Sequence, residues 1–323
     1  MKGRTGPMAQ ATQCAMGTVM THKAYGQYAD DSVAAVCREV EWLEKVLSRF
    51  VPDSEISRIN RAAGIKREKV SLETLDVLAK SAEFSRRLAG CFDVTIAPLV
   101  TLWKTARESG GLPDEPSVRQ AIRLVNHGDL LLDPQGMTAK LRRVGQGVDL
   151  GGIGKGCAGD KLVQAYRVFG ISSAYSNLGG NVVTVGTKPD GSAWRVGIQH
   201  PRHEDGLVGS VEVVNETVVT SGDYQRCWTD SQGRRHHHIL DPRTGYPADS
   251  GLVSVSIVAA KSLAADVLST AVFVAGMDKG LAFLRGFPGT EAILVDTGLR
   301  AYVTSGLRDR FQAGEGIDVT ILD

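Results

Sequence analysis

Two oxygen-bearing side chains interrupt an otherwise apolar segment late in the chain. Asp266 and Thr270 stand four residues apart among Ala, Leu and Val residues, so a helix would place both on one face. Carboxylate and hydroxyl oxygens suit Mg²⁺, and a backbone carbonyl from a glycine-rich loop would complete such a set. The structural alternative is that Asp266 pairs with a lysine or caps a turn while Thr270 bonds its own helix backbone. The spacing alone favours this alternative.

A glycine-rich segment, GQGVDLGGIGKGCAGD, occupies residues 145–160. It contains a literal G-x-G-x-x-G from Gly154 to Gly159, but no acidic residue follows about 20 positions later, as a dinucleotide-binding fold would need. A Walker A loop is also disfavoured, because Gly156 stands where Ser or Thr would follow the lysine. The glycines would still let backbone approach an anion at a helix start, with Lys155 as a mobile positive charge. A packed turn with a surface lysine explains the glycine count slightly better.

Three consecutive histidines, His236, His237 and His238, suggest a metal site or a proton acceptor. On a strand only His236 and His238 would share a face, and the spacing offers no third ligand, which disfavours zinc. One imidazole could instead accept a proton near pH 7. The neighbouring segments 221–224 and 241–245 are typical of turns first and of ligand loops second.

Hydrophobic periodicity predicts the elements that must position these residues. Spacings of three and four predict helices over 30–50, 71–90 with Ser71 as N-cap, 116–127, a run that ends at Gly170, and 261–276. The segment VPDSEISRIN between the first two helices is expected to be a loop. Apolar runs bounded by turn residues predict strands at DLLLD, TAKLRRV, NVVTVGT, AWRVGIQ, LVGSVEVV, RHHHIL and VSVSIVA.

The order of these elements is not a regular alternation of strand and helix. It therefore favours an α+β fold over a doubly wound parallel sheet. No low-complexity linker, fixed-period repeat or charge block marks a domain boundary in the sequence. We expect one α+β domain with subdomains over residues 14–323, after an N-terminal tail of residues 1–13.

Composition and charge exclude several classes of function. The 37 Lys and Arg residues nearly cancel the 36 Asp and Glu residues, so nothing favours a nucleic acid or an anionic membrane as partner. Five scattered cysteines without a C-x-x-C pair disfavour a disulfide framework or a cysteine-based zinc site. The sequence has no apolar run long enough to span a bilayer and no apolar signal segment at its start. We expect a cytoplasmic protein, or one of the periplasm or cell envelope if a leader is missing from the sequence.

Eight motifs, in order along nearly the whole chain, resemble those of the ApbE family of FAD:protein FMN transferases. The resemblance implies a T-fold-related α+β domain with mixed and antiparallel sheets flanked by helices, and a flavin site between two subdomains. The motifs that carry it are Ala15–Thr18, LSRFVPDSEISRIN, Phe92–Val100, VDLGGIGKGCAGD, SNLGGN, TSGDYQR, HHILDPRTGYP and AADVLSTA.

The resemblance also assigns roles to individual residues. It implies a Mg²⁺ site formed by the backbone carbonyl of Gly152 together with Asp266 and Thr270. Ser269 stands where some members have a second Asp, and Phe50 stands where Tyr or Trp is frequent, so the stacking face is kept without its polar tip. The residues that it places against FAD, with Asp93 as a polar contact, are Met16, Phe50, Cys91, Phe92, Asp93, Asp149, Lys155 and Leu240.

The activity implied is Mg²⁺-dependent transfer of FMN from FAD to a Thr or Ser hydroxyl of a target flavoprotein, with release of AMP. Lys155 would position the diphosphate, and His238 would act as base for the acceptor hydroxyl. Two alternatives use the same residues differently: a Mg²⁺-dependent FAD pyrophosphatase that yields FMN and AMP, and a non-catalytic flavin carrier. The implied partners are FAD and an acceptor flavoprotein with a Thr- or Ser-containing motif; the sequence leaves the acceptor's identity and the oligomeric state open.

Overall fold

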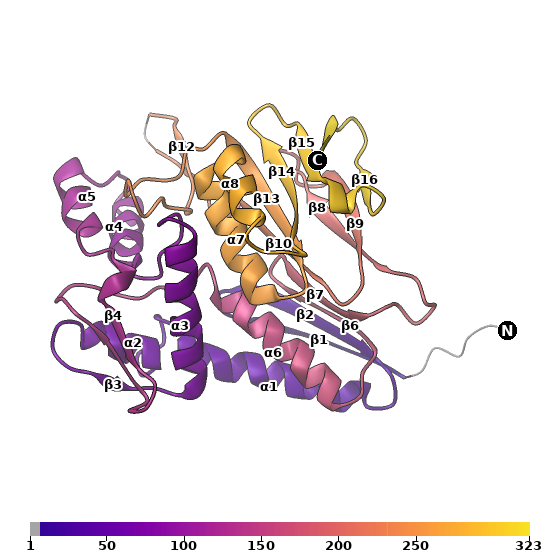
Figure 1. The fold of residues 1–323 in the computed structure, drawn as a ribbon, viewed down its shortest axis with the longest axis horizontal. Coiled ribbons are helices and arrows are strands. Elements are labelled where there is room, and N and C mark those ends of the chain that lie inside the picture. Colours follow the sequence, from indigo (N-terminus) through magenta and orange to yellow (C-terminus); the bar gives the residue numbers. More distant parts are fainter. Residues whose placement is uncertain (1–6, 231) are drawn as a thin grey trace.

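The computed structural model describes residues 7–230 and 232–323, which fold into mixed helices and sheets (Figure 1). Short 3₁₀ turns lie at His127–Asp129 and Ser305–Leu307. The helices are α1 (Ala29–Leu47), α2 (Glu55–Arg61), α3 (Leu72–Arg87), α4 (Ala97–Glu108), α5 (Glu115–Ile122), α6 (Gly154–Val168), α7 (Ser262–Ala275) and α8 (Met277–Leu284).

A nine-stranded sheet forms the centre of the molecule. Its neighbouring strands are antiparallel except for the last pair, β15 and β17, which is parallel. In spatial order the strands are β1 (Met8–Ala15), β2 (Thr18–Tyr25), β6 (Ser173–Leu178), β7 (Asn181–Gly186), β10 (Thr217–Gly222), β13 (Leu252–Ala259), β14 (Glu291–Asp296), β15 (Ala301–Thr304) and β17 (Val319–Leu322).

Three small sheets accompany the central one. The first, in the order β16-β9-β8, has a core that is continuous with one face of the central sheet. The second, β3-β5-β4, lies in the N-terminal part, and β11 pairs with β12 in a short hairpin. Their bounds are β16 (Phe311–Ala313), β9 (Leu207–Val213), β8 (Trp194–Gln199), β3 (Glu68–Lys69), β5 (Thr138–Leu141), β4 (Leu130–Asp133), β11 (Trp228–Thr229) and β12 (Arg235–His236).

Helices α1, α6 and α7 cover the other face of the central sheet (Figure 1). All eight residues of β13 are buried, because the helices cover one side of this strand and β8, β9 and β16 cover the other. The buried positions of α1, Val33, Val36, Val40, Leu43 and Leu47, recur every three or four residues. The periodicity therefore predicted α1 correctly. The mixture of helices with largely antiparallel sheets confirms the predicted α+β fold.

A second group of elements, α2 to α5 with the sheet β3-β5-β4, lies at the left of Figure 1. Its helix α3 begins after Ser71, whose hydroxyl accepts a hydrogen bond from the Thr74 amide, as the sequence predicted. A separate apolar cluster around Leu99, Trp103 and Leu240 joins α4 and α5 to the segment that follows β12. These elements form a subdomain beside the central sheet.

Four expectations from the sequence need correction. Residues 8–13 are not a tail, because they belong to β1, which pairs with β2 over its whole length. The expected loop at 51–60 contains α2, a helix of seven residues capped by Ser54, which is too short for a clear apolar period. Helix α5 ends at Ile122, earlier than the expected 127. The expected strand at RHHHIL shrinks to the two residues of β12, because the next two histidine rings bond loop carbonyls instead.

Within residues 7–230 and 232–323, no helix combines the length and the apolar character needed to cross a membrane. The helix α7 is strongly apolar but only 14 residues long, and it packs against β10 and β13. The hydrophobic side chains of α7 are therefore buried in the core of the protein.

Candidate active site

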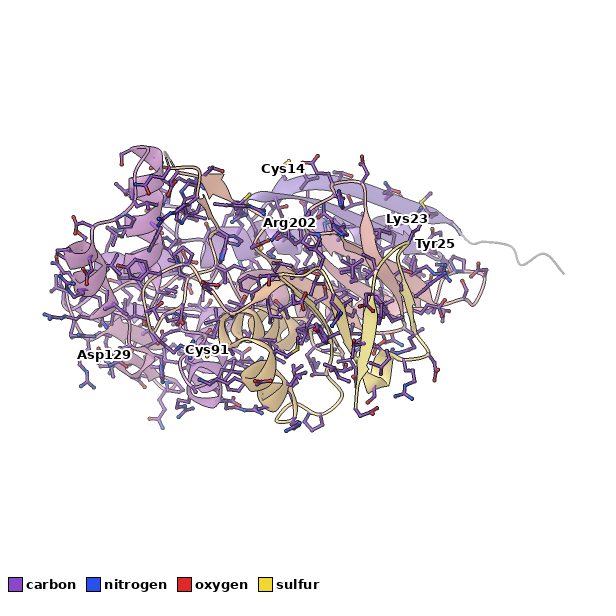
Figure 2. All side chains as sticks on the ribbon, turned by 90° about the horizontal axis from the view of Figure 1, so that it is seen from above. Cys14, Lys23, Tyr25, Cys91, Asp129 and Arg202 are labelled. Carbon is purple, nitrogen blue, oxygen red and sulfur yellow. The ribbon has the colours of Figure 1, made fainter. Side chains whose placement is uncertain are left out.

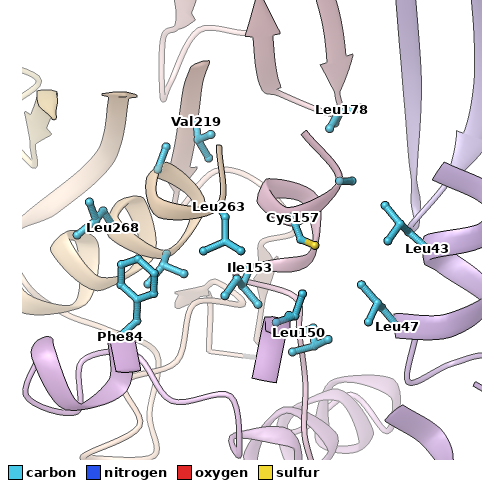
Figure 3. Packing of buried hydrophobic residues seen from close by; sticks show 14 of the residues in the cluster. Leu43, Leu47, Phe84, Leu150, Ile153, Cys157, Leu178, Val219, Leu263 and Leu268 are labelled. Carbon is cyan, nitrogen blue, oxygen red and sulfur yellow. The ribbon is translucent and has the colours of Figure 1, made fainter. Parts of the chain in front are cut away.

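The contact between α6 and α7 brings the glycine-rich segment to the predicted metal ligands. A Cβ on Gly156 would lie 2.5 Å from the Ser262 carbonyl oxygen and 2.7 Å from the Cβ of Asp266. The backbones therefore approach each other more closely than any larger residue would permit. In Figure 3, Leu263 of α7 faces Ile153 and the start of α6. Gly156 therefore serves the packing between two helices.

The Asp266 carboxylate is buried, with 3% of the residue exposed, and lies at this helix contact. Its Oδ2 accepts a hydrogen bond from the Gly156 amide at 2.8 Å, and its Oδ1 accepts one from Nδ2 of Asn181 at 3.0 Å. Both donors are neutral, and no salt bridge to Asp266 occurs among the residues that the structure describes. A buried carboxylate without a charged partner is costly, so this position suits a bound cation.

The structure brings Gly152 and Thr270 to the same place. A Cβ on Gly152 would lie 3.4 Å from Thr270 Oγ1, and Thr270 Oγ1 lies 3.4 Å from the backbone carbonyl oxygen of Asp266. Ser269 has a structural role: its hydroxyl donates to the Asp266 carbonyl at 2.9 Å and lies 2.9 Å from Ser221 Oγ. The three predicted ligands thus adjoin one another.

These donors are the chemical type that Mg²⁺ prefers. The described residues contain no cluster of three or more His, Cys, Asp or Glu side chains that could hold a metal. The predicted set instead offers one carboxylate, one hydroxyl and one backbone carbonyl, all of them oxygen ligands. A Mg²⁺ ion usually keeps several waters or substrate oxygens, so a small protein set is compatible with it.

Lys155 lies in the first turn of α6, next to the metal ligands. Its Nζ donates to Oδ1 of Asn181 at 2.9 Å, and Asn181 in turn bonds Asp266. The Ile153 side chain at the N-cap makes no capping hydrogen bond, but Asp266 Oδ2 accepts from the Gly156 amide in the first turn of α6. The positive end of the α6 dipole and a lysine beside it favour an anion such as a diphosphate.

Met16 lies at the tip of the hairpin between β1 and β2. Met16 and Gly17 have φ values of 50° and 71°, as a two-residue type I′ turn requires at both central positions. Methionine is unusual there, because side chains with a Cβ resist positive φ. The Met16 amide donates to Oε1 of Glu44 at 2.8 Å, which ties the turn to α1. Strain of this kind is typical of functional positions.

Phe50 follows α1 and is 68% exposed, which is unusual for so large an aromatic side chain. The Arg49 guanidinium carbon lies 5.2 Å from its ring centroid, and Lys104 Nζ lies 5.4 Å from it. Arg49 also forms an ion pair with Asp149, with Nη1 at 2.8 Å from Oδ2. Asp149 is therefore held in place by Arg49, while most of the Phe50 side chain is exposed to solvent.

Three predicted flavin contacts, Cys91, Phe92 and Asp93, lie where the N-terminal subdomain meets the C-terminal helices (Figure 2 labels Cys91). Burial raises the pKa of the Cys91 thiol. The Phe92 ring lies against Gly152, where an added Cβ would be 3.2 Å from its Cε2 atom. The Asp93 side chain is buried and bonded to its own chain, so a FAD contact would require it to exchange a partner.

Leu240 also differs from a simple ligand residue. It is 5% exposed and belongs to the apolar cluster with Leu99 and Trp103, so its side chain packs inside the N-terminal subdomain. Its backbone pairs with Pro247 in an isolated bridge. Any contact of Leu240 with a flavin nucleotide would therefore involve the backbone.

His238 is exposed to solvent, and its Nδ1 lies 2.9 Å from the backbone carbonyl oxygen of Gln225. Since a carbonyl oxygen only accepts, Nδ1 carries the hydrogen and the Nε2 lone pair is the proton-accepting position. Although part of the His238 side chain reaches solvent, desolvation by the surrounding protein, and then the positive charge of Arg226, lower the pKa of its imidazole to about 4. The charge of Lys155 acts in the same direction, so the two predicted catalytic residues lie within electrostatic reach of each other.

The other two histidines have different partners. His236 Nε2 lies 2.9 Å from Asp230 Oδ2, and its ring stacks with Trp228 at a centroid separation of 5.6 Å. His237 donates from Nε2 to the Ala248 carbonyl at 3.0 Å. Each imidazole is thus directed to a separate neighbour, and His238 bonds the carbonyl of Gln225, the residue before Arg226.

Several turns from distant parts of the sequence meet around these residues. Arg226 Nη2 donates to the Gly17 carbonyl at 3.3 Å, which joins the His238 neighbourhood to the Met16 hairpin. A Cβ on Gly179 would overlap the Thr18 side chain, so the hairpin turns of β1-β2 and β6-β7 are in contact. The Met16 hairpin, the β6-β7 turn and the segment that carries Arg226 therefore lie together at one end of the central sheet.

One surface cavity borders this site, and another lies away from it. A cavity of about 360 Å³ borders the Met16 hairpin, and Ala15, Gly17 and Glu44 help to line it. A larger one, of about 810 Å³, lies between the β8-β9 loop and the C-terminal turns, where it is lined by His200, Arg300 and others. Its lining includes none of the predicted site residues.

Three residues of the site were not identified from the sequence. Asn181 lies in the motif SNLGGN. Its hydrogen-bond partners, Lys155 and Asp266, are 26 positions earlier and 85 positions later in the sequence, and no sequence pattern predicts contacts over such separations. Arg49 directly precedes Phe50 in the sequence. This pairing of a cation with an aromatic residue is the feature from which a role of Arg49 beside the Phe50 ring could have been predicted. Gln225 acts through its backbone carbonyl, which no side-chain pattern reveals.

Comparison with known proteins identifies the family of this chain. The model of the ApbE family matches residues 16–294. An FAD:protein FMN transferase from Klebsiella pneumoniae (strain 342) is 34% identical over 300 residues, covering 92% of each chain. One from Treponema pallidum (strain Nichols) is 33% identical over 315 residues, covering 91% of this chain and 86% of the relative.

Solved structures extend the similarity to the fold. The ApbE protein from Thermotoga maritima superposes with a TM-score of 0.86 at 29% identity, covering 94% of this chain and 99% of that one. The flavinyl transferase ApbE from Pseudomonas stutzeri gives a TM-score of 0.82 at 30% identity, covering 97% and 100%. The resemblance found in the motifs is therefore confirmed across most of the sequence and across the fold: the chain belongs to the ApbE family.

Proposed function

We propose that this protein is a Mg²⁺-dependent FAD:protein FMN transferase. The observation that carries the proposal is the buried Asp266 carboxylate, which has only neutral hydrogen-bond donors among the described residues and adjoins Gly152 and Thr270. This cation position lies beside Lys155 and the N-terminus of α6, where a diphosphate would bind. The relatives named FAD:protein FMN transferase support the same activity.

The proposed reaction is a phosphoryl transfer. The oxygen of a Thr or Ser hydroxyl on the acceptor protein bonds to the FMN-side phosphorus of FAD. The bond from that phosphorus to the bridging oxygen breaks, and AMP leaves with the bridging oxygen. The hydroxyl proton passes to Nε2 of His238, which is free to accept it because Nδ1 is held by Gln225. The product is a phosphoester between FMN and the acceptor.

Charge accumulates on the diphosphate oxygens during this transfer. Mg²⁺ held by Asp266, Thr270 and the Gly152 carbonyl would supply positive charge to neutralise them. Lys155 would hold a diphosphate oxygen through its ammonium group, because its present partner, Asn181, is neutral. The positive end of the α6 dipole would attract the same group.

The flavin end of FAD would lie near the Met16 hairpin and Phe50. The exposed ring of Phe50 offers a face for stacking, flanked by the cations of Arg49 and Lys104. The Phe92 ring contacts Gly152, so it would lie between the flavin and the metal position. The second partner is an acceptor flavoprotein, whose hydroxyl would enter beside the solvent-exposed His238.

The test uses the full chain with FAD, MgCl₂ and a recombinant flavoprotein subunit that carries phosphoester-linked FMN on a threonine. The subunit is purified without flavin, and its Thr→Val variant is the control. We expect a fluorescent flavin band on the threonine protein in a denaturing gel, with one AMP released per FMN attached. Chelation of Mg²⁺ and the substitution Asp266→Ala should each abolish the band.

Other results would identify the alternatives. Free FMN and AMP without a labelled band would indicate a pyrophosphatase, in which water takes the place of the hydroxyl. FAD that binds and stays intact with Mg²⁺ present would indicate a carrier. Undiminished Mg²⁺-dependent labelling by Asp266→Ala would refute the assigned metal site.

A further inference from the structure

The Asn181 side chain connects the two charged groups of the proposed site. It is 1% exposed, and both ends of its amide are used: Oδ1 accepts from Lys155 Nζ at 2.9 Å, and Nδ2 donates to Asp266 Oδ1 at 3.0 Å. The amide orientation follows from chemistry, since an ammonium only donates and a carboxylate only accepts. Asn181 therefore separates the ammonium from the carboxylate by one neutral group.

The position of Asn181 is fixed by the hairpin between β6 and β7. Asn181 is the first residue of β7 and pairs with Leu178 across a two-residue turn. Gly179 and Gly180 have φ values of 64° and 98°, which glycine adopts without strain. Asn177 accepts a hydrogen bond from the Gly180 amide at 2.8 Å and closes the turn. The amide of Asn181 is thus held by rigid backbone.

We propose that Asn181 is a positioning residue that prevents Lys155 from pairing directly with Asp266. This inference rests on the proposed function, because it assigns the carboxylate to a divalent cation and the ammonium to the diphosphate. With the amide in place, Lys155 donates to Asn181 Oδ1 and not to the Asp266 oxygens, whose hydrogen-bond donors are both neutral. The same amide orients the carboxylate through Nδ2.

Removal of the amide would change the electrostatics of the site. An ammonium next to a buried carboxylate gains far more from a direct ion pair than it would in water. Lys155 would then neutralise Asp266 and compete with Mg²⁺ for its oxygens. Substitution of a group that orients a metal ligand typically lowers metal affinity 10- to 100-fold. We expect a loss of about that size for Asn181→Ala.

The experiment measures Mg²⁺ binding by isothermal titration calorimetry on the full chain without FAD, together with circular dichroism as a check on folding. The variants are Asn181→Ala, Asn181→Ala with Lys155→Met, and Asn177→Ala. Asn177→Ala is the matched control, because it removes an asparagine from the same hairpin without touching Lys155 or Asp266. We expect binding about 10- to 100-fold weaker than wild type for Asn181→Ala, binding by the double variant that is clearly tighter than that of Asn181→Ala, and unchanged binding for Asn177→Ala.

Each other result overturns the inference. Wild-type affinity in Asn181→Ala would mean that the amide does not matter for the metal. Weak binding that the Lys155→Met change does not restore would exclude competition by the lysine, and equal weakening in Asn177→Ala would assign the effect to the hairpin. If Asn181→Ala does not fold, Asn181→Leu fills the same volume without either hydrogen bond and replaces it. A wild-type protein that binds no Mg²⁺ also overturns the inference, and the FMN-transfer assay then decides the proposed function separately.

Discussion

The Gly156 amide donates to Asp266 Oδ2 at 2.8 Å across the contact between α6 and α7. The bond is possible because Gly156 has no side chain: a Cβ there would lie 2.7 Å from both Asp266 Cβ and Leu263 Cα. One glycine thus closes the helix pair and orients the carboxylate that we assign to the metal. Packing and chemistry depend on the same short distance.

Substitution of Gly156 by alanine should therefore affect both properties. The added methyl group must push α7 away from α6, and overpacking of this kind costs about 1–3 kcal/mol of unfolding free energy. Mg²⁺ affinity should fall as well, because the shift removes a donor from Asp266. Urea unfolding and calorimetric Mg²⁺ titration measure the two effects.

Gly154→Ala is the matched control for stability in the same helix. Its nearest neighbour would be Leu150 Cβ at 3.9 Å, an ordinary contact, and alanine favours helices by about 0.5–1 kcal/mol over glycine. This variant should be as stable as wild type or slightly more so. Equal stability of the two variants would show that the helices can separate without cost.

The sequence predicted those parts of the site that depend on local periodicity. Asp266 and Thr270 were placed on one face of a helix by their spacing, and α7 confirms that helix. The glycine segment was correctly expected to precede a helix, which is α6. The short helix α2 was missed, because seven residues contain only two buried apolar positions, Ile56 and Ile59.

The remaining parts depend on contacts between distant segments. Asn181 meets Asp266 only after β7 and α7 pack together, and no spacing in the sequence encodes an 85-residue separation. The Gln225 carbonyl that fixes the His238 tautomer belongs to the backbone, which has no sequence signature. The resemblance to the ApbE family implied roles for single residues. The two hydrogen bonds, from Asn181 to Asp266 and from His238 to Gln225, could be identified only from the folded structure.

The strained turn at Met16 predicts a conflict between stability and flavin binding. Met16 has φ 50°, where asparagine is preferred, so Met16→Asn should relax the turn and raise the unfolding free energy by about 0.5–1 kcal/mol. The same change removes the apolar side chain proposed to contact the flavin. We expect the KM for FAD to rise about tenfold, equivalent to about 1.4 kcal/mol of lost binding. Urea unfolding and initial rates at several FAD concentrations measure these effects.

Met137→Asn is the control for the effect on KM. Met137 has φ 49° in another turn and is not among the predicted site residues. Its replacement by asparagine should leave the KM for FAD unchanged. If Met16→Asn also left the KM unchanged, Met16 would have no contact with the substrate.

Buried His22 should make the protein sensitive to acid. It is fully buried on β2, with Nδ1 at 2.9 Å from Ser176 Oγ and Nε2 at 3.2 Å from Nε2 of Gln13. Burial lowers the pKa of the His22 imidazole to about 4, whereas an unfolded histidine titrates near 6.5. The unfolded state therefore binds the proton first as pH falls. The stability contributed by neutral His22 is complete above pH 6.5 and is lost as pH falls from 6.5 towards 4.

The loss attributable to His22 between pH 7 and pH 4.5 should be about 2–3 kcal/mol. Urea unfolding of wild type and His22→Gln at both pH values measures it, and the variant should lose less stability on acidification. The exposed His203 provides a control through His203→Gln, which should keep the wild-type dependence. Parallel pH profiles for wild type and His22→Gln would assign the acid sensitivity to other groups.

The tautomer of His238 predicts how FMN transfer depends on pH. With the pKa lowered to about 4 and Nδ1 committed to Gln225, Nε2 is unprotonated throughout the neutral range. The rate should therefore be insensitive to His238 between about pH 6 and 8 and fall as pH approaches 4, where the base becomes protonated. His238→Gln should lower kcat about 10²- to 10⁴-fold with little change in the KM for FAD, and it should lack the acidic limb.

His236→Gln is the neighbouring control, because His236 bonds Asp230 and stacks with Trp228 away from the proposed acceptor path. This variant should keep kcat within about threefold of wild type, since general-base catalysis requires a group within hydrogen-bond reach of the transferred proton. Circular dichroism at each pH separates loss of the base from unfolding caused by His22. A His238→Gln enzyme that retained most of the wild-type kcat would assign the proton to another acceptor, such as solvent water, and would leave His238 with only its structural bond to Gln225.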